Sequence, residues 1–186
     1  MRLFVAADID DDTRRQLAAA QHALQSVLRE ARVPPRITWV SPLTAHVTLR
    51  FLGETSEETA TLVQSALAAL PFHPFAVTWG TIGTFGGSRN PKVIRVGLTA
   101  GLAPFMRLAQ EVDARLDPVM GAGRSQPFTP HLTLGRVRAR GRGVDWARVL
   151  QAVSFTAMVT RVEHVTLYLS RLSSKGPTYT AVSIHG

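Results

Sequence analysis

The spacing of apolar residues changes along the chain between two periods, which predicts a mixed order of strands and helices. Apolar runs or period-two alternation, typical of strands, occupy residues 1–8, 37–40, 46–52, 75–85, 93–98, 131–137, 157–172 and 179–184. Apolar positions three and four residues apart, typical of amphipathic helices, occupy residues 13–31, 55–70, 105–116 and 144–153. The acidic run at 10–12 and a capping box at Thr55-Ser-Glu-Glu58 favour the first two helix starts.

Several of these strands follow one another as hairpins between the helices, instead of alternating strictly with them. In one such pair, the strands at 75–85 and 93–98 are joined by a turn at 86–91 that is rich in glycine and ends in proline. This order favours an α+β fold with mainly antiparallel sheet. Because 186 residues are in the range of one domain, we expect a single domain over residues 1–186.

The tetrapeptide His-x-Thr-Leu stands at the start of two predicted strands, at His46 and at His131. Successive side chains of a strand point to opposite faces, so each histidine shares a face with the threonine two residues later, Thr48 or Thr133. The apolar residues between them anchor the opposite face in the core. The repetition predicts two lobes related by a pseudo-twofold axis, with both histidines facing a central cleft and helices on the outside.

Two imidazoles that face one cleft suit general acid-base catalysis, because imidazole titrates near neutral pH. A neutral histidine removes a proton from the attacking water or hydroxyl, and a protonated histidine gives a proton to the departing oxygen. The neighbouring threonine hydroxyls donate hydrogen bonds to the non-bridging oxygens of a phosphate. The paired motifs therefore predict in-line phosphoryl transfer that requires no metal and no other cofactor.

A third copy of the tetrapeptide begins at His164. We expect a structural role for it, because it lies in the middle of the predicted strand 157–172, while His46 and His131 lie at strand starts and next to loops. The remaining histidines lie outside the repeated motif, and we expect structural or solvated roles for them: His22, His73 and His185.

The composition narrows the classes of partner and compartment. Lys and Arg exceed Asp and Glu by 21 to 13, and the formal net charge of +8 favours RNA or another polyanion as a partner. No apolar run approaches the length needed to cross a bilayer, so we expect no membrane partner. The absence of cysteine excludes disulfides and thiolate catalysis and fits a reducing compartment, so we expect a cytoplasmic protein. We also expect it to be a monomer.

Two longer segments, His46-Val-Thr-Leu-Arg-Phe-Leu-Gly53 and Phe128-Thr-Pro-His-Leu-Thr-Leu-Gly-Arg136, resemble the signature segments of a known family. It is the bacterial and archaeal 2'-5' RNA ligase or RNA 2',3'-cyclic phosphodiesterase family, within the two-histidine phosphoesterase superfamily. Three further segments are similar to family segments in the same order, so the resemblance spans nearly the whole chain: Met1-Arg-Leu-Phe-Val-Ala, Pro91-Lys-Val-Ile-Arg-Val-Gly-Leu98, and Leu169-Ser-Arg-Leu with Gly176-Pro-Thr-Tyr179.

The resemblance implies a bilobal fold with a basic central cleft. It also implies metal-independent hydrolysis of RNA 2',3'-cyclic phosphate ends, as on a tRNA fragment or an oligonucleotide, to 2'-phosphates, and a reverse reaction that forms a 2'-5' linkage. In this family pattern His46 is the proton donor to the departing 3' oxygen, and His131 is the proton acceptor that activates water. Thr48 and Thr133 bind the phosphate.

Two arginines are candidate phosphate contacts. Arg136 matches a basic position that follows the second motif in the family, but simple alternation places it on the face opposite His131, so this role requires a bulge or a twist. Arg50 shares the face of His46 by the same alternation and is the alternative contact. The chain departs from the family pattern at Arg95, where an aromatic residue is expected.

Two other functions remain open on the sequence alone. A metal-dependent phosphohydrolase would use His46, His131 and His164 as a three-histidine site, although only Glu163 adjoins one of the motifs. A non-catalytic RNA-binding module would depend on arginine content, including the cluster that follows the second motif at positions 136, 138, 140 and 142.

Overall fold

The computed structural model describes residues 1–87, 89–123, 127–173 and 176–186. The turn predicted at 86–91 includes position 88, which lies outside these ranges. Within them the elements follow in this order: β1 (Arg2–Ala7), α1 (Asp11–Arg29), β2 (Arg36–Trp39), the 3-10 turn η1 (Pro42–Thr44), β3 (Val47–Glu54), α2 (Glu57–Ala68), β4 (Phe75–Phe85), β5 (Val93–Ala100), α3 (Leu102–Met120), β6 (His131–Ala139), α4 (Trp146–Ala152), β7 (Met158–Val162), β8 (Val165–Ser173) and β9 (Gly176–His185).

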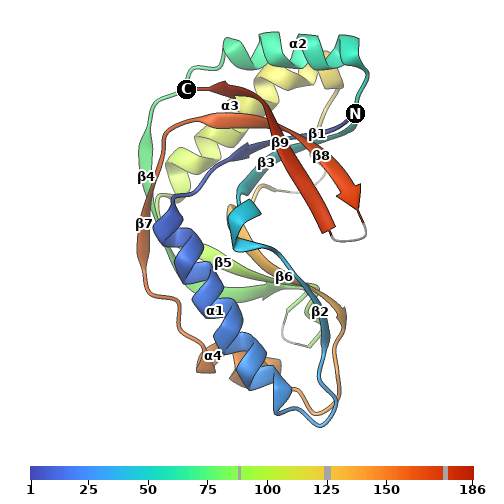
Figure 1. Ribbon diagram of the computed structural model, residues 1–186. Coiled ribbons are helices and arrows are strands. Elements are labelled where there is room, and N and C mark those ends of the chain that lie inside the picture. Colours follow the sequence, from blue (N-terminus) through green and yellow to red (C-terminus); the bar gives the residue numbers. More distant parts are fainter. Residues whose placement is uncertain (88, 124–126, 174–175) are drawn as a thin grey trace.

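The strands form two antiparallel sheets, one above the other in Figure 1, which confirms the predicted α+β class. The upper sheet has the order β3-β1-β8-β9, and α2 and α3 pack against it. The lower sheet has the order β2-β6-β5-β4-β7, and α1 and α4 lie beside it. Strands β3 and β6, which carry the two tetrapeptides, therefore belong to different sheets.

The first two helices begin at side-chain caps. Asp10 accepts a hydrogen bond from the backbone N–H of Thr13 at 2.7 Å and starts α1, and Asp11 and Asp12 follow in the first turn, where acidic groups are favoured. The cap of α2 is Ser56, one residue after the predicted Thr55. No helix within the described ranges is both long and apolar enough to cross a membrane.

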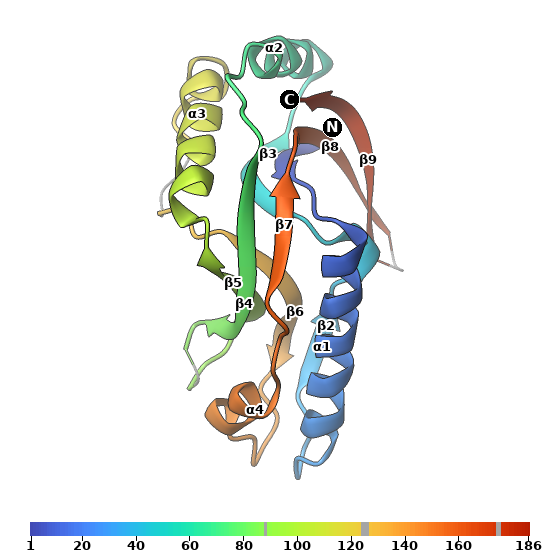
Figure 2. The same ribbon diagram turned by 90° about the vertical axis from the view of Figure 1, so that its left-hand side faces the viewer.

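The segment predicted as one strand over 157–172 is two strands, β7 and β8, which belong to different sheets. Figure 2 shows β7 running from α4 along the edge of the lower sheet to the point where the chain enters the upper sheet. Val162 is the last residue of β7 and Val165 the first of β8, so the chain passes from the lower sheet to the upper sheet at Glu163 and His164.

Helix α1 is tied by hydrogen bonds to β6, which carries the second tetrapeptide, to the residue after β2, and to β7. The buried Gln21 amide donates to the carbonyl oxygens of Val40 at 2.6 Å and Leu134 at 2.8 Å. A buried pair of hydroxyls, Thr13 and Thr160, joins α1 to β7 at 2.7 Å. These contacts satisfy polar groups that lie against the apolar core, and they hold β2 and β6 in position under the cleft.

Candidate active site

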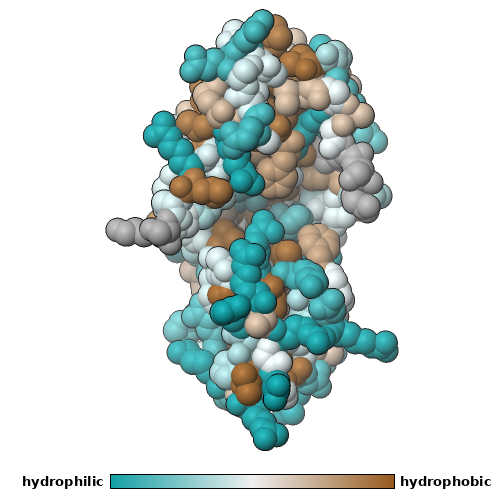
Figure 3. All heavy atoms as spheres, turned by 90° about the vertical axis from the view of Figure 1, so that its right-hand side faces the viewer, coloured by the Kyte–Doolittle hydropathy of each residue, from teal (hydrophilic) through white to brown (hydrophobic). Residues whose placement is uncertain are grey.

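A cavity of about 660 Å³ lies between the two sheets, and residues from both sheets line it. Figure 3, which views the molecule from the right of Figure 1, shows a hollow between the two lobes with hydrophilic side chains gathered below it. The charged residues among its described lining are Arg2, Arg136 and Arg138, and none of these lining residues is acidic. The positive charge makes the cavity suitable for a ligand that contains phosphate.

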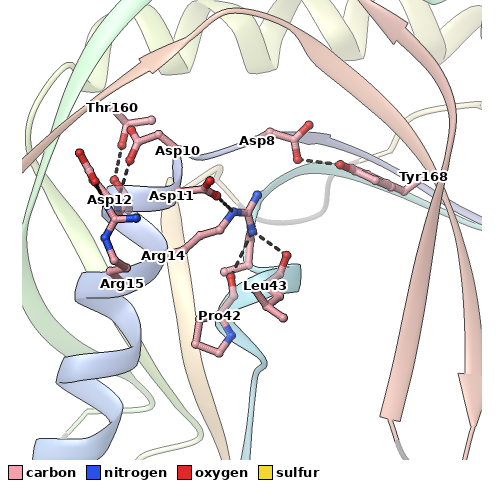
Figure 4. A network of polar contacts seen from close by, with 12 residues as sticks. Asp8, Asp10, Asp11, Asp12, Arg14, Arg15, Pro42, Leu43, Thr160 and Tyr168 are labelled. Carbon is pink, nitrogen blue, oxygen red and sulfur yellow. Dashed lines mark hydrogen bonds and ion pairs between the residues drawn. The ribbon is translucent and has the colours of Figure 1, made fainter.

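His46 lies directly before β3 and is held at both ring nitrogens. Nδ1 is 2.8 Å from the carbonyl oxygen of Thr44, which only accepts hydrogen bonds, so Nδ1 carries the proton in the neutral ring. Nε2 is 3.1 Å from the hydroxyl of Thr48. The side chain of Arg14 reaches from α1 to the carbonyl oxygens of Pro42 and Leu43, and so holds the turn that presents Thr44 (Figure 4).

His131, the first residue of β6, is held in the same way by the carbonyl oxygen of Thr129, 2.8 Å from Nδ1. The ring of Phe85 meets the imidazole edge-on, with 4.8 Å between ring centroids. Arg95 lies behind this pair, with its guanidinium carbon 4.7 Å from the Phe85 ring centroid. The departure from the family pattern at Arg95 thus places a cation near His131, although Arg95 is not among the residues that line the cavity.

In both motifs a backbone carbonyl two residues earlier binds Nδ1, which leaves Nε2 as the nitrogen that can exchange a proton with a ligand. Thr48 and Thr133 line the same cavity as the histidines. The predicted meeting of two imidazoles and two hydroxyls in one cleft is therefore what the structure shows.

Burial lowers the pKa of both histidines from the ordinary imidazole value. For His46 the hydrogen bond to Thr44 and the negative charge of Asp8 oppose this effect, while Arg14 and His131 add to it. For His131 the hydrogen bond to Thr129 opposes burial, and Arg95 and Arg136 add to it. Both rings therefore favour the neutral form at pH 7 more than an ordinary imidazole does.

Each motif strand contains a β-bulge at the leucine of its tetrapeptide. Across β1 the partner of Val5 is Arg50 and that of Ala6 is Thr48, which leaves Leu49 as the extra residue. Across β5 the partners of Ile94 and Arg95 are Gly135 and Thr133, which leaves Leu134 as the extra residue. A bulge shifts the alternation by one residue, so both strands turn a new set of side chains toward the cavity from this point on.

Simple alternation would place Arg136 on the face opposite His131. The bulge in β6 reverses this, and Arg136 and Arg138 line the cavity. The bulge in β3 has the opposite effect on Arg50, because it brings Phe51 to the cavity instead. The expectation that Arg50 shares the face of His46 is wrong.

The Arg50 side chain is only 2% exposed and binds helix α3. Its guanidinium donates to Asp117 at 2.5 Å, to Asp113 at 3.3 Å and to the carbonyl oxygen of Gly121 at 2.6 Å. These partners occupy the guanidinium, and Arg50 is not among the described residues that line the cavity.

The third tetrapeptide does not contribute to the cavity. His164 lies at the start of β8, as His46 lies at the start of β3, so the prediction of a mid-strand position is wrong. Its Nε2 is 3.2 Å from the carboxylate of Asp8, and it does not line the cavity with the other two histidines. Within the described ranges no three His, Asp or Glu side chains are grouped so that they could hold a metal ion. His22, His73 and His185 also lie outside the cavity lining.

The sequence did not identify several residues that the fold brings to the cavity. Tyr179 of β9 meets His46 edge-on at 5.3 Å between ring centroids, and Trp39 of β2 lines the lower side. Phe51 lies on the upper side and is 66% exposed. The one signal for Phe51 was its place after the first tetrapeptide, which matches the place of Arg136 after the second.

Comparison with known proteins places the chain in a family. The sequence profile of the 2'-5' RNA ligase superfamily matches residues 9–172. An RNA 2',3'-cyclic phosphodiesterase of Archaeoglobus fulgidus is 33% identical over 180 residues, which cover 96% of each chain. The crystal structure of TT0787 of Thermus thermophilus has a TM-score of 0.77 and 29% identity, covering 99% of this chain and 96% of that one. E. coli LigT complexed with 3'-AMP shares the fold, with a TM-score of 0.69 and 22% identity over 98% of this chain and 95% of that one. The profile match and the full-length relative together show that the chain belongs to the 2'-5' RNA ligase superfamily.

Proposed function

We propose that the chain hydrolyses RNA 2',3'-cyclic phosphate ends to 2'-phosphates, with His46 as proton donor and His131 as proton acceptor. The observation that carries the proposal is the shared geometry of the two histidines. Each is held at Nδ1 by a backbone carbonyl, and each faces one basic cavity beside a threonine hydroxyl. The relative in Archaeoglobus fulgidus is named for the same activity and supports this choice of substrate.

In the proposed reaction Nε2 of His131 takes a proton from a water molecule as the water oxygen attacks the phosphorus atom. The bond between phosphorus and the 3' oxygen breaks, and Nε2 of His46 gives its proton to that oxygen. The products are a 2'-phosphate and a 3'-hydroxyl, so atoms and protons balance. Proton transfer of this kind contributes about 10²- to 10⁴-fold to a rate.

The remaining site residues bind the phosphate in this proposal. Thr48 and Thr133 donate hydrogen bonds to its non-bridging oxygens, and Arg136 supplies the positive charge that these oxygens need as the phosphorus becomes five-coordinate. All three line the cavity beside the histidines. Arg138 lines it as well and extends the positive charge towards the RNA that precedes the cyclic phosphate.

The same residues can perform a ligation. If the 5'-hydroxyl of a second RNA replaces water as the nucleophile, the same displacement joins the two RNAs through a 2'-5' phosphodiester and releases the 3' oxygen.

We also propose that residues 1–186 are one domain, because each sheet supplies one histidine to the cavity. We propose further that the chain acts as a monomer in the cytoplasm.

Product analysis tests the proposal. An RNA that ends in a 2',3'-cyclic phosphate is incubated with the protein in EDTA, and the product is compared with authentic 2'- and 3'-phosphate standards. We expect the 2'-phosphate, and losses of about 10²-fold or more in kcat/KM for His46→Ala and His131→Ala. His73→Ala is the control, because it removes an exposed histidine that does not line the cavity.

Three outcomes contradict the proposal. Full activity in both His46→Ala and His131→Ala would exclude the two-histidine mechanism. Stoichiometric zinc with EDTA-sensitive turnover would favour the metal-dependent alternative. Salt-dependent RNA binding without consumption of the cyclic phosphate would identify a non-catalytic binding module.

A further inference from the structure

At one edge of the upper sheet, a row of polar residues lies just beyond the paired residues of three neighbouring strands. Ala7 of β1 pairs with Val47 of β3 on one side and with Val165 of β8 on the other. One residue beyond these partners lie His46, Asp8 and His164, in that order across the sheet. Asp8 therefore lies, in the order of the strands, between the histidine of the first tetrapeptide and that of the third.

The third tetrapeptide and its next alternate residue hold this carboxylate. Oδ2 of Asp8 accepts from the Thr166 hydroxyl at 2.9 Å and is 3.2 Å from Nε2 of His164. Oδ1 accepts from the Tyr168 hydroxyl at 2.7 Å, a contact drawn in Figure 4. The three donors occupy alternate positions of β8 and converge on one carboxylate, so they orient it.

A stack of aromatic rings joins this cluster to His46. The ring of Tyr168 stacks on Phe4 with 5.3 Å between centroids, and Phe4 packs against the imidazole of His46 at 4.8 Å. Burial, together with the bond to Asp8 and its charge, raises the pKa of the Tyr168 hydroxyl, so this hydroxyl remains a donor at neutral pH. Asp8 is thus fixed relative to His46 by the packed rings as well as by the ladder of strands.

We propose that Asp8 is a positioning residue whose negative charge keeps His46 available as the proton donor, and that the third tetrapeptide serves to hold Asp8 in place. The proposal rests on the proposed function for the role of His46. It gives the third His-x-Thr-Leu copy a task that differs from that of the other two.

The charges around His46 explain why such a residue is needed. Arg14 from α1 and His131 from β6 both disfavour the protonated ring, and burial does the same. Tyr168 from β8 and Tyr179 from β9 also face the ring but are neutral donors. The hydrogen bond to the Thr44 carbonyl opposes these effects, and the negative charge of Asp8 adds to it, so both raise the pKa of His46.

The pH dependence of kcat/KM separates the two catalytic roles. Well above both histidine pKa values, the rate is proportional to the protonated fraction of the donor. Well below both, it is proportional to the deprotonated fraction of the acceptor. A change that lowers only the pKa of the donor therefore lowers the rate on the alkaline side and leaves the acid side unchanged.

The experiment compares Asp8→Asn, which removes the charge and keeps an oxygen acceptor, with Asp12→Asn as the matched control. Asp12 lies in the first turn of α1, where it pairs with Arg15. We expect Asp8→Asn to lower kcat/KM by about 3- to 10-fold on the alkaline limb of the profile and to change it by less than about twofold on the acid limb. Asp8→Glu, which keeps the charge, should recover the alkaline activity, and Asp12→Asn should match the wild type.

An NMR titration of the His46 ring in the same variants gives a readout that does not depend on turnover. The His46 pKa should fall in Asp8→Asn and stay unchanged in Asp12→Asn. An unchanged His46 titration in Asp8→Asn would overturn the role of Asp8, whether or not the protein hydrolyses cyclic phosphates.

The kinetic and folding results can overturn the proposal separately. A rate increase confined to the acid side would show that His46 is the acceptor, and would overturn its role as donor. If Asp8→Asn and Asp8→Ser both fail to fold, Asp8 is required for the fold itself, and a tuning role is excluded. Absence of hydrolysis in the wild type would refute the proposed function, while the NMR comparison would still report on Asp8.

Discussion

Replacement of Arg50 by methionine should destabilise the fold and leave catalysis largely intact. The guanidinium is buried and ion-paired with Asp113 and Asp117, whose side chains are 22% and 45% exposed. Removal of one partner from a fully buried ion pair costs about 3–5 kcal/mol, and the partial exposure of both carboxylates reduces this to about 2–3 kcal/mol. For a chain of this size, that loss in the free energy of unfolding lowers Tm by about 5–10 °C.

The matched variant is Arg136→Met, since Arg136 is an exposed arginine on the cavity side of the other motif strand. Thermal unfolding and kcat/KM on a cyclic-phosphate RNA are measured for both variants, with activity assayed well below the lower Tm. We expect Arg50→Met to lose Tm and keep kcat/KM within about threefold, and Arg136→Met to keep Tm and lose at least about 10-fold in kcat/KM. The reverse result, a stable Arg50→Met that has lost activity, would refute the assignment of Arg50 to the core.

The site and its lower wall lead to three further predictions. Because burial lowers the pKa of His46 and of His131, the bell-shaped profile of kcat/KM should be centred below pH 6.5, and a centre above pH 7 would contradict this. The same shifts mean that the unfolded chain binds more protons, so the free energy of unfolding should fall as the pH drops below about 6.5, measurable as a lower Tm at pH 5.5 than at pH 7.5. Gly135→Ala should cost about 1–3 kcal/mol in denaturant unfolding, because a Cβ there would lie 2.7 Å from Ile37 Cγ2 and 3.1 Å from Trp39 Cε3. Gly83→Ala, where the nearest atom would be 4.0 Å away, is the control, and equal losses in the two variants would contradict the steric explanation.

That His46 and His131 share one cavity could be predicted from the sequence, because the face on which each side chain of a motif lies depends on the residues of that motif alone. Alternation in a strand fixes which side chains share a face with the histidine, and the apolar neighbours fix which face is buried. The prediction failed at Arg50, where the bulge at Leu49 interrupts the alternation. A bulge depends on pairing with another strand, and no pattern within the segment showed it.

The strand break before β8 also depended on tertiary structure. An apolar segment over 157–172 is compatible with one long strand, and it is divided only because β7 pairs with β4 in one sheet and β8 pairs with β1 and β9 in the other. For the same reason the relation between Asp8 and His164 was hidden. They are 156 residues apart and become neighbours only because β1 and β8 pair.

The position of β1 in the upper sheet also has a consequence for the synthesis of the protein. β1 is the first strand to be made, yet one of its two partners is β8, and Asp8 must find donors 156 to 160 residues later in the chain. Contacts at such separations form slowly, and β1 keeps an unpaired edge until β8 has emerged. A nascent chain that stops before residue 165 already contains His46 and His131 but lacks the strand that orients Asp8. The part of the site around His46 is therefore completed late in translation, after β6, which carries His131, has been made.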